Sequence, residues 1–159
     1  MADYSALLAA FIGASSAIGA NFLHHFFNRI VANGERKESQ RDSDLKRIEN
    51  VVEETRALAV EYWSLPGEGL DQEKRVAAIN GRMGFLFGIV EALFGNDPIQ
   101  SDYVGNYLTN FHEACTSGDY QVRSRLPDTP RISEIEVKAF QFLHSAEKCR
   151  RQLKRAWLG

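Results

Sequence analysis

The stretch YSALLAAFIGASSAIGANFLHHFFN, residues 4–28, contains no Asp, Glu, Lys or Arg in 25 residues. A helix of that length spans roughly 37 Å, enough to cross a hydrocarbon core of about 30 Å. We therefore expect a transmembrane helix within residues 1–33. Two alternatives remain open, a cleaved signal peptide and a buried helix of a soluble bundle.

The basic residues near this stretch predict its orientation. None precedes it, whereas Arg29, Arg36, Lys37 and Arg41 follow it closely. Positive charge is enriched on the cytoplasmic side of membrane helices. We expect a single-pass protein of the cell inner membrane, with its N-terminus outside and its C-terminal domain in the cytoplasm.

Small and polar residues recur along one side of the expected transmembrane helix, at steps of four and three. Small residues let membrane helices approach closely, and polar side chains hydrogen-bond across such an interface. We therefore expect the helix to self-associate into a homo-oligomer, with a polar end that could line a pore. The alternative is that the polar residues mark the headgroup level. The row comprises Ala10, Ala14, Ala17, Asn21, His24 and Asn28.

Residues 34–69 are expected to form a charged juxtamembrane helix and a linker. Apolar residues follow a helical period there, with Ile48, Val52, Ala59 and Tyr62 on one face. The sequence SLPGEGLD, residues 64–71, then interrupts the helical pattern with Pro and Gly.

Residues 70–159 are expected to form a cytosolic helical domain. The first helix should begin after Asp71 and end near Phe94, and a second should be capped by Ser101. A capping box formed by Ser133 and Glu136 should begin the last one. Because no alternating run predicts a strand, the fold class is all-α, a small helical bundle below a membrane anchor.

The helix expected over residues 71–94 and its end are rich in glycine. Glycine costs about 1 kcal/mol in a helix interior. We interpret the repetition as close packing against a neighbouring helix. The residues concerned are Gly81, Gly84, Gly88 and Gly95.

No catalytic or cofactor motif is recognisable in the chain. Cys115 and Cys149 have neither the spacing of a zinc site nor partners for a disulfide framework, and we expect them to be buried free thiols in a reducing compartment. We therefore expect no enzyme activity, no cofactor and no metal.

The chain is basic after Tyr120, with nine Lys or Arg residues against four acids. Four of the basic residues, Arg150, Arg151, Lys154 and Arg155, lie close to the C-terminus. They could be a solvated helix end, contact anionic lipid, or bind a phosphorylated ligand. Nucleic acid is a less favoured partner because the net charge of the chain is −2.

These features predict a membrane-anchored homo-oligomer whose cytosolic domain acts as a sensor or binding domain. Its transmembrane helices would assemble, and it could act as a pore-forming or membrane-perturbing effector. The layout resembles that of small bacterial membrane effectors of stress or phage-defence systems, in architecture only. The alternative function is a passive membrane-tethered scaffold that presents a helical interaction domain.

Overall fold

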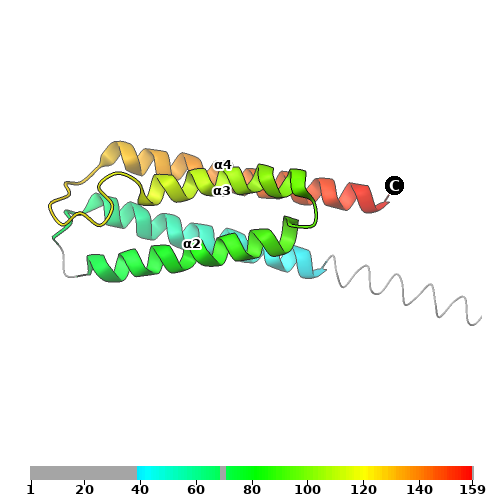
Figure 1. Ribbon diagram of the computed structural model, residues 1–159, viewed down its shortest axis with the longest axis horizontal. Helices are drawn as coiled ribbons and strands as arrows, with labels where there is room; N and C mark the ends of the chain where they lie inside the picture. The colour runs from blue at the N-terminus through cyan, green and yellow to red at the C-terminus, as the bar shows by residue number, and fades with distance from the viewer. Residues whose placement is uncertain (1–38, 69–70, 159) are drawn as a thin grey trace, which may run out of the picture. The chain divides into compact units, whose positions relative to one another are not determined.

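A computed structural model describes residues 39–68 and 71–158, with side chains up to residue 152 (Figure 1). The first helix covers residues 39–64 of the described chain. It is followed by α2 (Gln72–Phe94), α3 (Pro98–Thr116) and α4 (Thr129–Leu158). No strand occurs in these ranges. The predicted all-α class is confirmed for this part of the chain.

Residues 43–159 form one compact unit. Within it the helices run alternately up and down, so that neighbours in sequence are antiparallel (Figure 1). Ion pairs join the first helix to both of its neighbours: Glu54 pairs with Arg82 of α2 at 3.1 Å, and Arg56 pairs with Glu136 of α4. The bundle is therefore closed, with α3 packed between α2 and α4.

The core is formed by one apolar face from each helix. The face predicted for residues 48–62 is confirmed, since Ile48, Val52 and Ala59 are fully buried. Between α3 and α4, the rings of Phe111 and Phe142 stack with centroids 6.5 Å apart. The helical period of the apolar residues thus explains which faces meet.

The helix starts agree only in part with the prediction. Asp71 precedes α2 as expected, although its side chain makes no capping hydrogen bond. The prediction that Ser101 caps the next helix is wrong, because Asp97 accepts a hydrogen bond from the Gln100 backbone N–H. The capping box at Ser133 is also wrong. The helix begins earlier, where Asp128 accepts from the Arg131 backbone N–H at 3.0 Å.

Both cysteines are buried free thiols, as predicted. Burial raises the pKa of the Cys115 thiol to about 12 and also raises that of Cys149. Because the thiolate is the reactive form, both raised pKa values make these thiols less reactive at pH 8.

We therefore expect a thiol reagent to modify neither cysteine of the native protein rapidly at pH 8, and both at once in denaturant. A cysteine introduced at Phe140, which is 71% exposed, supplies the control and should react immediately. Native Cys115 reacting as fast as the Phe140→Cys thiol would contradict the burial described here.

Candidate functional site

A row of exposed residues follows the outer side of α2. Its centre consists of Gly81, Gly84 and Gly88, all exposed. A Cβ placed on any of the three would meet no atom within 4 Å. The predicted close packing of these glycines against a neighbouring helix is therefore wrong within the described chain. At Gly95 the three atoms nearest to an added Cβ all belong to Glu91 of the preceding turn, at 2.5–2.9 Å.

The row continues beyond the glycines in both directions. Ala77 and Lys74 extend it toward the start of α2, and Glu91 extends it toward the end, all of them exposed. The steps between successive members are three, four, three, four and three residues, which keeps them on one side of a helix. We call this row the α2 face: Lys74, Ala77, Gly81, Gly84, Gly88 and Glu91.

Aromatic side chains flank the α2 face on both sides. Phe87, 40% exposed, lies edge-on to His112 of α3. On the other side, Phe85 lies 4.7 Å from the guanidinium carbon of Arg47 on the first helix. The face is thus a shallow path of small residues between two larger side chains, a shape that admits another helix.

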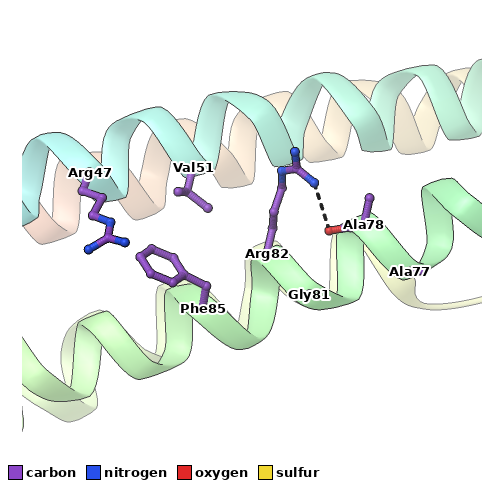
Figure 2. Close-up of a pocket in the computed structure, with 7 residues that line it drawn as sticks. All are labelled: Arg47, Val51, Ala77, Ala78, Gly81, Arg82 and Phe85. Atoms are coloured by element: carbon purple, nitrogen blue, oxygen red, sulfur yellow. Dashed lines mark hydrogen bonds between the residues drawn. The ribbon is translucent and has the colours of Figure 1, made fainter.

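Beside Gly81 the surface is hollowed between α2 and the first helix (Figure 2). This pocket has a volume of about 370 Å³. Arg82 reaches across it, with Nη1 donating to the Ala78 carbonyl at 3.4 Å and Nε facing Glu54. The apolar side chains that line the pocket are Val51, Ala77, Ala78 and Phe85, and Arg47 lies over the ring of Phe85.

The predicted basic cluster near the C-terminus is only partly described. Arg150 is 6% exposed and therefore belongs to the buried side of α4. Arg151 is exposed and pairs with Glu147 one turn earlier. The side chains of Lys154 and Arg155 lie outside the described residues, as do Ala10, Ala14, Ala17, Asn21, His24 and Asn28 of the predicted transmembrane row.

Two further properties bear on the expected function. Among the described residues, α2 has the length and composition of a membrane span, as the core helix of a soluble protein also can, and 28% of its apolar window is buried. The same residues contain no group of three or more His, Cys, Asp or Glu arranged to hold a metal ion.

No protein family, curated protein or solved structure matches this chain. The function is therefore argued from the geometry of the chain itself.

Proposed function

We propose that this protein is a membrane-anchored homo-oligomer whose helical domain binds a second copy of itself through the α2 face. The observation that carries the proposal is the open space above Gly81, Gly84 and Gly88. Three glycines in one helix cost about 3 kcal/mol relative to alanine, and packing within the described chain does not account for them. A partner helix at close range gives them a role.

The spacing of the α2 face favours an antiparallel partner. The spacing between its members is the same from either end of the row. A twofold axis that passes between Arg82 and Met83 therefore places each member opposite a different member of the second copy. Gly81 then lies opposite Gly84 of the second copy, and Ala77 lies opposite Gly88. A twofold interface requires this self-complementary arrangement.

The charges at the two ends of the α2 face favour the same arrangement. In the antiparallel pair Lys74 of each copy lies opposite Glu91 of the other. In a parallel pair in register, Lys74 would lie opposite Lys74 and Glu91 opposite Glu91. Such contacts between like charges are destabilising. Among the described residues Lys74 pairs with the exposed Asp71 at 3.1 Å, and such an exposed pair can be exchanged at little cost.

The membrane anchor in this proposal is the uncharged stretch 4–28, with the N-terminus outside and the helical domain in the cytoplasm. Its row of small and polar residues would supply a second self-association interface, and an assembly of such helices could perturb the membrane. The alternative remains a passive membrane-tethered scaffold, in which the helical domain acts as a monomer.

The test is membrane fractionation combined with crosslinking of the full-length protein. We expect wild-type protein in the membrane fraction and crosslinked dimers between cysteines placed at Ala77 and Gly88. Gly84→Leu should weaken association at least about tenfold, or 1.4 kcal/mol, because the added side chain holds the helices apart. It should not unfold the monomer, since the site is open and leucine is a better helix former than glycine.

Gly105→Leu on α3 is the matched control, because a Cβ there also meets no atom within 4 Å. Glu91→Lys should weaken association, and the double variant Lys74→Glu, Glu91→Lys should restore it. Unchanged dimers in Gly84→Leu, or no rescue in the double variant, would refute the α2 interface. Protein found in the soluble fraction would refute the anchor separately.

A further inference from the structure

Arg125 is a buried cation without a counterion among the described residues. Its side chain is 3% exposed, although it belongs to the irregular segment 117–128 between α3 and α4. Nη2 donates to the backbone carbonyl of Tyr62 at 2.8 Å. Nε and Nη1 are buried and have no hydrogen-bond partner in the described chain. Natural proteins rarely leave buried charged donors unsatisfied.

Two aromatic rings offset part of the free-energy cost of burying this charge. The guanidinium carbon of Arg125 lies 4.1 Å from the ring centroid of Tyr62 and 4.7 Å from that of Trp63. Such contacts stabilise the face of a guanidinium group. They leave the N–H donors in its plane unsatisfied, and those donors suit an oxygen anion.

Arg125 lines a pocket of about 500 Å³ at the end of the bundle where the segment 117–128 lies. Its other lining residues include Trp63, Gly118, Asp119, Ser124, Asp128 and Arg131. Small-molecule sites have volumes of this order. Arg131 also lies over Trp63, at 4.9 Å, but its Nε faces Asp128 at 3.7 Å. The charge of Arg131 is thus compensated inside the pocket, whereas that of Arg125 is not.

We propose that this pocket binds the oxyanion group, carboxylate or phosphate, of a small molecule, with Arg125 as the principal ligand of the anion. Nε and Nη1 together carry three N–H donors for it. Because both nitrogens are buried, the anion reaches them when the neighbouring part of the segment 117–128 shifts. The pocket is separate from the α2 face, so this inference does not depend on the proposed dimer.

The segment that must shift is attached at its middle as well as near its ends. At its middle the Gly67 N–H donates to the Arg125 carbonyl at 2.9 Å. The Asp128 backbone N–H donates to the Trp63 carbonyl at 3.0 Å, and the Gln121 N–H donates to the Tyr62 hydroxyl at 2.9 Å. Between these attachments Ser124, Leu126 and Pro127 are exposed. A displacement of residues 122–127 that exposes the guanidinium group therefore has to break the Gly67–Arg125 hydrogen bond or carry Gly67 with it, while the attachments at Gln121 and Asp128 remain.

The test uses the full-length protein in mild detergent, in a Trp157→Phe background so that Trp63 is the remaining tryptophan. Sodium phosphate and sodium succinate are titrated against sodium chloride of equal ionic strength. We expect a saturable change in Trp63 fluorescence and a higher melting temperature with phosphate or succinate, but not with chloride. The anion that produces the larger change identifies phosphate or carboxylate as the group that the pocket prefers.

Arg125→Met removes the charge and should abolish the response, while the variant melts no lower than wild type without anion, because it no longer buries an uncompensated charge. Arg125→Lys keeps the charge and should weaken apparent affinity at least about tenfold, through lost donors. Arg123→Met, in the same segment but 88% exposed, is the control and should respond like wild type. Wild-type protein that responds to neither anion beyond chloride, or Arg123→Met failing equally, would overturn the proposal.

Discussion

Replacing Trp63 with alanine is expected to lower the free energy of unfolding by about 5 kcal/mol. The side chain is 1% exposed, and truncating a buried tryptophan costs about 3–5 kcal/mol. The indole Nε1 also donates to the Cys115 carbonyl at 2.9 Å, and an acceptor left unsatisfied costs about 1–3 kcal/mol more. Urea denaturation of the full-length protein measures the change.

Two further variants make the Trp63 result interpretable. Trp63→Phe keeps most of the buried ring surface but loses the N–H donor, so it should fall between wild type and alanine. Phe140→Ala, at a side chain that is 71% exposed, should change stability by less than about 0.5 kcal/mol. A Trp63→Ala protein as stable as Phe140→Ala would mean that the indole is not part of the core.

The second large effect is expected at Phe142, where alanine should cost about 3–5 kcal/mol. The side chain is fully buried in α4 and its ring stacks on Phe111 of α3, with an interplanar angle of 10°. Removing it opens a cavity between two long helices that cannot easily close. Thermal and urea unfolding should both report the loss.

Ile99→Ala is the matched control for Phe142→Ala, since Ile99 is 83% exposed near the start of α3. Adding Phe111→Ala to Phe142→Ala should cost less than the sum of the two single changes, because both remove the same ring contact. Full additivity of the two losses would contradict direct packing of the two rings.

The sequence predicted the helical faces well because burial follows a local period. Ile48, Val52 and Ala59 recur on one side of a helix whatever the neighbours are. Helix starts were harder to predict because several residues compete to cap them. At both misplaced starts an aspartate comes before a proline of the first helical turn: Asp97 directly before Pro98, and Asp128 two residues before Pro130. Proline favours the first turn of a helix. The serines farther along were therefore not needed as caps.

The candidate sites depend on contacts that a single sequence does not reveal. The glycines of α2 are evident in the sequence, but whether a helix packs on them depends on where the other helices lie. Arg125 gives no local signal, because it is buried by Tyr62 and Trp63, about sixty positions earlier. Arg150 looked like part of a solvated basic end, yet it lies on the buried side of α4.

In a bundle with an even number of antiparallel helices, the chain enters and leaves at the same end, or pole. The first helix begins, and α4 ends, at one pole of the compact unit (Figure 1). The segment 117–128 with Arg125 lies at the opposite pole (Figure 1), roughly 30 Å away at 1.5 Å per residue along the 19 residues of α3. The proposed anion pocket therefore lies at the end of the compact unit opposite to the one at which the chain enters it.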